Sequence, residues 1–339
     1  MTNAATLGSF GDVSGSPLVF RNKIINGGFD IWQRGTSQTS SGYGSDDRWF
    51  NENLGSTKTA SRQTFTLGQT DVPANPKYFS RTVVTSVAGV ANYASKKQSI
   101  EGVTTFAGQS ATLSFWAKAD AAKNIAVEFV QAFGTGGSPS ATITSIGVTT
   151  FALTTTLQRF TVTISIPSIS GKTLGTNADD CLVANFWFDA GSNYNARTNS
   201  LGQQSGTFDI ANVQLEAGSS PTPFEQRPIG MELDLCRRYF ESGTCVGPAS
   251  SVLIVIPYYP KRIISINSVT TTARTTSNLW NISEAYFGIG ISTISYTGVG
   301  TLSEAADGIG IVYANGIIVR TPTALATFNR ISFAFSAEL

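Results

Sequence analysis

Two pairs of neighbouring carboxylates are the residues of this chain whose types best suit chemistry. Asp46-Asp47 and Asp179-Asp180 could supply the acid and the base of glycoside hydrolysis, which uses two carboxyl groups on either side of the bond that breaks. Neighbouring residues of a strand point to opposite faces of the sheet, so neither pair can flank a bond by itself. A pairing of one of these aspartates with a carboxylate from elsewhere in the chain stays open.

Histidine is absent from all 339 residues. Its absence removes the commonest general base, the Ser-His-Asp and Cys-His nucleophile systems, and most zinc and iron sites. The three cysteines, Cys181, Cys236 and Cys245, are odd in number and lack the spacing of a metal site, so at least one is free. We therefore expect neither an oxidised disulfide framework nor an enzyme.

The charges of the chain are few and balanced. There are 23 basic and 22 acidic residues, which give a net charge of +1, and they form no long runs. We expect no nucleic-acid partner and no membrane surface as a partner. No apolar run approaches the ~20 residues that a membrane-spanning helix needs, and residues 1–20 lack the basic start and apolar middle of a signal peptide. Membrane insertion is not expected.

Aromatic side chains outside the alternating apolar pattern are candidates for glycan binding, because an aromatic face stacks on a sugar ring. They are Tyr43, Tyr93, Trp187 and Tyr194. Trp187 lies between Phe186 and Phe188, so it should face away from their side of the strand and be exposed. Tyr194 and the neighbouring Asn193 belong to the stretch GSNYNARTN, whose amides and hydroxyls suit a sugar, although surface loops commonly have this composition.

The stretch NGGFDIWQRGT, residues 26–36, has two interpretations. Trp32, Gln33 and Arg34 could form a sugar platform, with the indole under the ring and the polar groups on its hydroxyls. Alternatively, Trp32 fills one end of a core while Arg34 pairs with Asp46 or Asp47 to fasten the loop. The stretch lies where the first strand enters the fold, and Asn-Gly-Gly is turn chemistry. We favour the architectural interpretation.

The elements that must position these residues are strands with one apolar and one polar face. The apolar positions alternate at Leu113, Phe115 and Ala117; at Ile125, Val127 and Phe129; at Phe160, Val162, Ile164 and Ile166; at Leu182, Ala184, Phe186 and Phe188; and at Phe208 and Ile210. This pattern is typical of antiparallel sheets packed face to face. The sequence predicts an all-β protein whose residues 21–227 form a jelly-roll-like antiparallel β-sandwich.

Three further segments flank the predicted sandwich. Residues 1–20 read as an irregular arm that docks on a partner. An apolar stripe after Pro228 predicts a short connecting helix over 228–242, which lies either on its own domain or at a subunit interface. Residues 243–339 should form a smaller C-terminal β domain, for oligomerisation or as a tip, with a hairpin that turns at Asn315-Gly316.

Several of these stretches occur together in a known family. RNKIINGGFDIWQRGTS, DDRW, LSFWAKA and TFDIANVQLEAGSSPTPFEQRPIGMELDLCRRYFE resemble, in this order, motifs of bacteriophage virion proteins that include tail fibres and carbohydrate-binding tail proteins. The resemblance covers residues 21–241.

The resemblance implies a binding function without catalysis. It implies a carbohydrate-binding jelly roll on the virion, assembled in the host cytoplasm as a homotrimeric tail fibre or spike. Residues 1–20 would bind other virion proteins, and the sandwich would attach the particle to host cell-surface saccharide. The main alternative is a purely structural fibre of the head or collar without a ligand. A polysaccharide depolymerase is less favoured.

The resemblance also implies a possible structural Ca²⁺. In carbohydrate-binding jelly rolls of this kind, an acidic residue after the Asn-Gly corner and one in the last strand often share the ion. Here they would be Asp30 and Asp209, and carboxylate oxygens from separate segments suit a hard cation. The alternative is that each aspartate is satisfied by backbone amides.

Overall fold

The computed structural model describes residues 20–247 together with 253–257, 269–272, 294–297, 312–313, 316–320 and 329–336. The predicted docking arm, residues 1–20, lies outside these ranges except for its last residue. The chain divides into two compact units between Arg227 and Pro228, the point at which the sequence places the start of the connecting helix.

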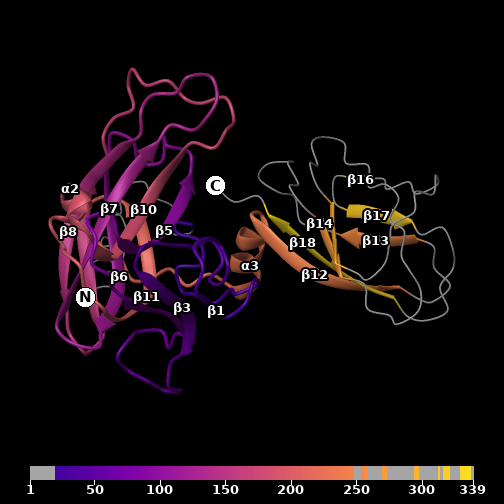
Figure 1. The fold of residues 1–339 in the computed structure, drawn as a ribbon, viewed down its shortest axis with the longest axis horizontal. Helices are drawn as coiled ribbons and strands as arrows, with labels where there is room; N and C mark the ends of the chain where they lie inside the picture. The colour runs from indigo at the N-terminus through magenta and orange to yellow at the C-terminus, as the bar shows by residue number, and fades with distance from the viewer. Residues whose placement is uncertain are drawn as a thin grey trace, which may run out of the picture. The chain divides into compact units, whose positions relative to one another are not determined.

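The first unit is a sandwich of two sheets, drawn in indigo to orange in Figure 1. The six-stranded sheet has the order β1 (Ser37–Gln38), β3 (Thr57–Thr64), β4 (Tyr78–Thr85), β11 (Gly206–Ala217), β6 (Ser110–Ala119) and β9 (Gln158–Ser165). The five-stranded sheet has the order β2 (Phe50–Leu54), β5 (Tyr93–Glu101), β10 (Cys181–Ala190), β7 (Lys123–Ala132) and β8 (Ile143–Leu153). All their pairings are antiparallel, and the chain crosses repeatedly between the sheets. The predicted jelly-roll-like antiparallel β-sandwich is confirmed.

The core lies between the sheets and consists of the apolar residues that alternate along the strands. Leu182, Phe186 and Phe188 of β10 are fully buried. Phe186 meets Phe115 of β6 edge-on, with ring centroids 5.2 Å apart, so the two layers interlock through aromatic pairs. The other face of β10 is thereby turned outward, away from the core.

The register of the five-stranded sheet decides which side chains share that outer face. On the central strand β10, Asn185 lies opposite Lys97 of β5 and Glu128 of β7. Along β10, Trp187 and Val183 occupy the same face two residues to either side of Asn185. Val183 lies opposite Val130 of β7. Residues far apart in the sequence are thus brought into adjacent rows.

A loop with two short helices follows β10. The helices are η1 (Ser192–Tyr194) and α2 (Asn195–Thr198). The backbone N–H of Asn193 donates to Val90 O at 3.0 Å. Asn199, with φ of 50°, ends α2 in the left-handed region that asparagine tolerates. The helix α2 contacts β7 and β8, which places Tyr194 and Arg197 above the outer face.

The NGGFDIWQRGT stretch is an architectural corner, as favoured from the sequence. The Asn26 side chain bridges Ile31 and Asp47 through three hydrogen bonds of 2.8–3.0 Å. Trp32 packs against the main core, and the Asp47 carboxylate accepts from both amides of Gln33. A Cβ on Gly27 would lie 2.1 Å from the Val213 carbonyl oxygen, so only glycine fits where the corner meets β11.

The second unit begins with α3 (Ile229–Arg237). Its strands are β12 (Phe240–Gly247), β13 (Leu253–Pro257), β14 (Val269–Thr272), β15 (Ile294–Thr297), β16 (Val312–Tyr313), β17 (Gly316–Arg320) and β18 (Asn329–Ser336). The prediction of a helix over 228–242 is wrong at its end. Phe240 instead pairs with Ser336 of β18, because pairing between distant strands outweighs a helical apolar period. The antiparallel pairing of Tyr313 with Gly316 agrees with the predicted hairpin, but Gly316 is the first residue of β17 and is not a turn residue as predicted.

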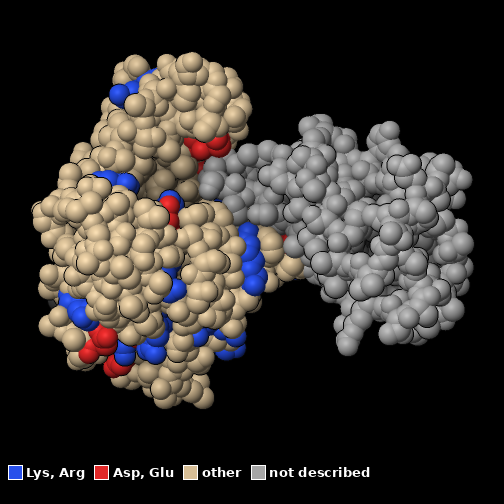
Figure 2. Space-filling model, in the orientation of Figure 1, with Lys and Arg blue, Asp and Glu red and all other residues tan. Residues whose placement is uncertain are grey.

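Charges are scattered over the surface. On the face drawn in Figure 2, the described residues form small groups of both signs on a largely uncharged surface. None of the helices in the described part of the chain has the length and apolarity that crossing a bilayer requires.

Candidate functional site

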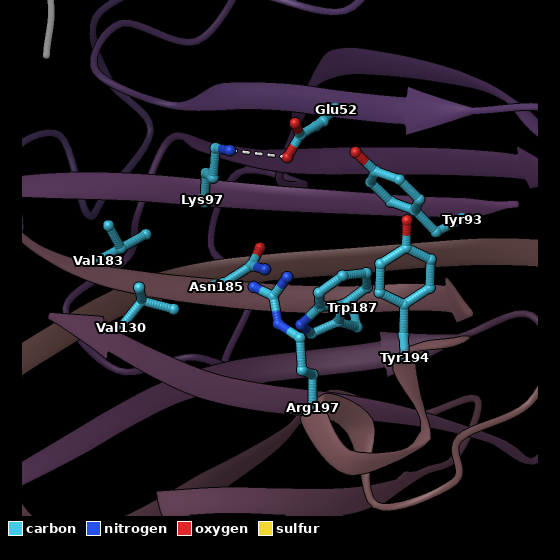
Figure 3. A pocket seen from close by; sticks show the side chains of 9 residues that line it. All are labelled: Glu52, Tyr93, Lys97, Val130, Val183, Asn185, Trp187, Tyr194 and Arg197. Atoms are coloured by element: carbon cyan, nitrogen blue, oxygen red, sulfur yellow. Dashed lines mark hydrogen bonds and ion pairs between the residues drawn. The ribbon is translucent and has the colours of Figure 1, made fainter. Parts of the chain in front are cut away.

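A pocket of about 220 Å³ opens on the outer face of the five-stranded sheet. Its lining side chains come from β2, β5, β7, β10 and the loop after β10. They are Glu52, Tyr93, Lys97, Val130, Val183, Asn185, Trp187, Tyr194 and Arg197 (Figure 3). The pocket is smaller than the roughly 300–1,000 Å³ of sites that enclose a drug-sized ligand, so it suits a group of about one sugar ring.

Three aromatic rings form one end of the pocket. The centroid of Tyr93 lies 5.3 Å from that of Trp187 and 4.9 Å from that of Tyr194, and Trp187 and Tyr194 are 5.1 Å apart. The prediction that Trp187 faces away from Phe186 and Phe188 holds, but the expectation that it is exposed is wrong. Trp187 is 2% exposed, because Arg197 lies over its ring. Tyr93 and Tyr194 offer the accessible aromatic surface.

A buried carboxylate organises the wall beside the rings. Glu128 is fully buried and accepts a hydrogen bond from Trp187 Nε1 at 3.1 Å. It also accepts from both Nε and Nη2 of Arg197 and from Asn185 Nδ2 at 3.3 Å. One carboxylate therefore orients an aromatic, a cationic and an amide side chain, as preorganised binding sites require.

The opposite wall carries an ion pair. Lys97 Nζ lies 2.7 Å from Glu52 Oε2, with both side chains about a third exposed. The Tyr93 hydroxyl lies on the same side of the pocket as Glu52 (Figure 3). Burial raises the pKa of Tyr93, and the charge of Glu52 raises it further. The hydroxyl thus remains a proton donor into alkaline solution.

Asn185 carries a hydrogen-bond acceptor for which the structure shows no partner. Asn185 is 3% exposed, and its Oδ1 is buried without a hydrogen-bond partner. Because the Glu128 carboxylate only accepts, the amide nitrogen must face it, and this turns Oδ1 the other way. A buried polar atom without a partner carries a free-energy cost, which a ligand that donates a hydrogen bond to Asn185 Oδ1 would offset.

Two other predicted residues, Asn193 and Tyr43, do not line the pocket. Asn193 holds Val90 through its backbone and does not line the pocket. Tyr43 packs edge-on against Phe50, with centroids 5.0 Å apart, and the Arg34 guanidinium lies 5.5 Å above its ring. Tyr93, Trp187 and Tyr194 are therefore the predicted aromatics that the structure brings together.

Sequence reasoning missed the polar half of the pocket. Asn185 could have been found, because it shares the outward face of its strand with Trp187 two residues away. Lys97, Glu52 and Glu128 carry no comparable signal, because their place depends on which strands are neighbours.

The predicted carboxylate pairs are structural. Asp46 is buried against Lys96, and Asp47 holds Gln33. Asp179 accepts from Thr135, and Asp180 accepts from the backbone N–H of Val103 at 2.8 Å. Glu52 is the one carboxylate among the residues that line the pocket, so the described residues do not place an acid and a base on either side of a ligand there.

The two residues predicted to share calcium have different environments. Asp209 accepts a bidentate bond from Arg81 at 2.7 and 2.9 Å, and Lys118 Nζ is 3.9 Å away. These cations neutralise the Asp209 carboxylate and leave it less suited to Ca²⁺ than Asp30; the calcium site stays a prediction. No group of three or more carboxylate or thiol residues that could hold a metal occurs among the described residues.

Asp30 lies beside a small cavity at the first corner. It lines a cavity of about 10 Å³ with Asn212 and Gln226, roughly the space of one water-sized sphere. Asn212 Oδ1 is buried without a hydrogen-bond partner. Asp30, Asn212 and Gln226 would supply the oxygen ligands that Ca²⁺ prefers, and the ion would hold the first corner to β11.

Comparisons with known proteins find distant likenesses only. No protein-family model and no curated protein sequence matches the chain. A solved structure described as CBM4 is 17% identical, covers 57% of this chain and 98% of its own, and has a TM-score of 0.32. A family 11 carbohydrate-binding module from Clostridium thermocellum in complex with a β-1,3-1,4-mixed-linked tetrasaccharide is 11% identical, with 55% and 98% covered and a TM-score of 0.31.

A third similar structure is the enzymatically active domain of tailspike protein 4 from bacteriophage CBA120. It is 14% identical, with 58% of this chain and 22% of that chain covered and a TM-score of 0.33. All three TM-scores are below 0.5, so the assignment of the fold rests on the strand order and register given above, and no ligand is inferred from these structures.

Proposed function

We propose that this chain is a non-catalytic saccharide-binding protein and that the pocket over β5, β10 and β7 is its binding site. The observation that carries the proposal is the meeting of the Tyr93–Trp187–Tyr194 rings with a buried, unpartnered amide oxygen on Asn185. A sugar has apolar C–H faces and hydroxyls that donate and accept, so it matches an aromatic surface beside convergent polar groups.

The biological setting is part of the same proposal. The chain is a subunit of a bacteriophage tail fibre or spike, a homotrimer that attaches the virion to host saccharide. The motifs over residues 21–241 that resemble phage virion proteins support this setting. A shallow pocket binds one sugar weakly, and several copies on one particle raise the avidity through effective concentration.

The test is binding of the purified full chain to an array of host-derived and commercial glycans, followed by calorimetry on each positive. Tyr194→Ala should weaken binding about tenfold, because it removes a stacking surface. Tyr78→Ala is the matched control, since Tyr78 lies on β4 with Arg62 over its ring, away from the pocket. It should bind as the wild type does.

The alternatives predict other results. A purely structural fibre would bind none of the glycans on the array. A depolymerase shortens a polysaccharide during incubation, which size-exclusion chromatography would reveal. Equal loss of binding in Tyr194→Ala and Tyr78→Ala would place the binding site elsewhere.

A further inference from the structure

We propose that the pocket selects saccharides that carry an acetamido (N-acetyl) substituent. This inference rests on the proposed saccharide binding and adds the chemical class of the ligand. It follows from three features of the pocket that an acetamido group matches together: a buried acceptor, an apolar patch beside it, and balanced charge.

The acceptor is Asn185 Oδ1. It is buried, unpartnered and held in orientation by the bond from Nδ2 to Glu128 at 3.3 Å. Such an atom gains most from a ligand that presents an N–H or O–H at a fixed position. The amide N–H of an acetamido group is a donor held rigid by its planar geometry.

The apolar patch consists of Val183 and Val130. They lie directly opposite each other on β10 and β7, two residues along from the Asn185–Glu128 pair, and both line the pocket. In Figure 3 the two valines lie at one end of the pocket and the tyrosines at the other, with Asn185 between them. A sugar ring on the tyrosines with its N–H on Asn185 would direct the acetyl methyl group toward the valines. A free hydroxyl would gain nothing from them.

Each charged side chain that lines the pocket forms an ion pair with a side chain of opposite charge. Lys97 is matched by Glu52 and Arg197 by Glu128, so no net charge favours a uronic acid or an amino sugar. Lys97 Nζ sits on a flexible stem and is flanked by Asn185 across the strands. Because Asn185 Oδ1 is buried, binding requires a neighbouring side chain to move; Lys97 would be that side chain, and its ammonium group would then donate to the acetamido carbonyl.

The experiment compares sugars that differ only in one substituent. Calorimetry on the full chain uses tetrasaccharides of glucose, glucosamine and N-acetylglucosamine in the same linkage. Galactose is compared with N-acetylgalactosamine in the same way. In the configuration that binds, the acetamido form should bind about tenfold or more tightly than the hydroxyl form, and the amine form should bind no better than the hydroxyl form.

Two matched variants test the placement of the group. Val183→Thr keeps the shape of the side chain but replaces a methyl with a hydroxyl, so it should reduce the preference for the acetamido form about threefold. Val83→Thr is the control, because Val83 is 40% exposed on β4 of the other sheet. It should leave the preference unchanged.

The outcomes separate this inference from the proposed function. Equal binding of hydroxyl and acetamido forms, lost in Tyr194→Ala, would overturn the selectivity while saccharide binding stands. An unchanged preference in Val183→Thr would overturn the placement of the methyl group. No binding of any glycan on the array would overturn both proposals.

Discussion

The guanidinium of Arg197 meets the fully buried carboxylate of Glu128, with Arg197 Nε 3.1 Å from Glu128 Oε2. Arg197 belongs to α2, a helix of four residues, whereas isolated helices shorter than ~12–15 residues are marginal in water. The bond to Glu128 therefore helps to hold the loop that carries Tyr194. Rigidity of the pocket depends on a contact between segments 69 residues apart in the chain.

We expect Arg197→Met to destabilise the protein and to weaken saccharide binding. The variant keeps the apolar stem but leaves Glu128 buried without its cation, which costs ~3–5 kcal/mol for a fully buried pair. Because the Arg197 side chain is 31% exposed, we expect about 1–2 kcal/mol after discounting for solvent screening. Urea unfolding measures this change.

The control for Arg197→Met is Arg62→Met, because Arg62 also lies over an aromatic ring, that of Tyr78. It should change the free energy of unfolding by less than about 0.5 kcal/mol. Equal midpoints for Arg197→Met and the wild type would show that Glu128 does not need this cation.

Asp46 and Lys96 form an ion pair inside the sandwich, 0% and 1% exposed. Burial by itself would raise the pKa of Asp46, but the charge of Lys96 and hydrogen bonds from Lys96, Ser45 and Asn51 hold it below its usual 3.8. The unfolded chain then binds the proton more tightly, so this contribution to stability is present above pH ~4 and is lost as the pH falls further.

Asp46→Asn should cost about 3–5 kcal/mol, because it leaves Lys96 buried and unpaired. It should also flatten the dependence of unfolding free energy on pH below about 4. If the single variant does not fold, the double variant Asp46→Asn/Lys96→Met measures the same effect, and it should recover most of the stability. A double variant no more stable than the single one would contradict the role of the pair.

Lys58 is a second buried lysine, 3% exposed, whose Nζ donates to Ser95 O at 3.0 Å. Burial and repulsion by Lys96 place its pKa well below the usual 10.5. The unfolded chain then binds the proton more tightly than the folded chain, so stability should rise with pH as the solution approaches pH 10.5.

Lys58→Met should remove most of this rise and stabilise the protein at neutral pH, on the order of 1 kcal/mol. Thermal melts between pH 7 and pH 10 measure the effect. A lower melting temperature for Lys58→Met at pH 7 would mean that the amine contributes more through its bond to Ser95 than its burial costs.

A further prediction concerns the removal of calcium from the corner that contains Asp30. EDTA should lower the melting temperature of the wild type at matched ionic strength if Asp30, Asn212 and Gln226, which line a cavity of about 10 Å³ together with Ala74, Pro76 and Phe224, hold a calcium ion. Asp30→Asn should remove the response to EDTA. Asp209→Asn should keep it while lowering stability through the loss of the bond to Arg81. A melt that EDTA leaves unchanged would exclude calcium from this corner.

Much of the fold could be predicted from local patterns. Alternation such as that of Leu182, Phe186 and Phe188 determines which face of a strand is buried, because successive side chains point to opposite sides. The same rule placed Trp187 on the outer face. The Asn26-Gly-Gly corner could also be predicted, since its turn and the bonds between the Asn26 side chain and Ile31 lie within one stretch of chain.

The end of α3 and the partner of Asp209 could not be read in this way. Phe240 belongs to a strand because Ser336 lies beside it, and Asp209 meets Arg81 because β11 pairs with β4. These contacts join residues 96 and 128 positions apart, and an apolar period carries no information about which strands become neighbours over such separations.

The sequence by itself determined that the chain is a sandwich of antiparallel sheets, with aromatics on its outer surface and no histidine chemistry. Only the tertiary structure decided that Tyr93, Trp187 and Tyr194 are one cluster, and that Glu52, Lys97, Asn185 and Glu128 complete the pocket. The physical reason is that sidedness follows from backbone geometry within one strand, whereas a site depends on the order and register of several strands. The order and register of the strands depend on the free energy of packing the whole core.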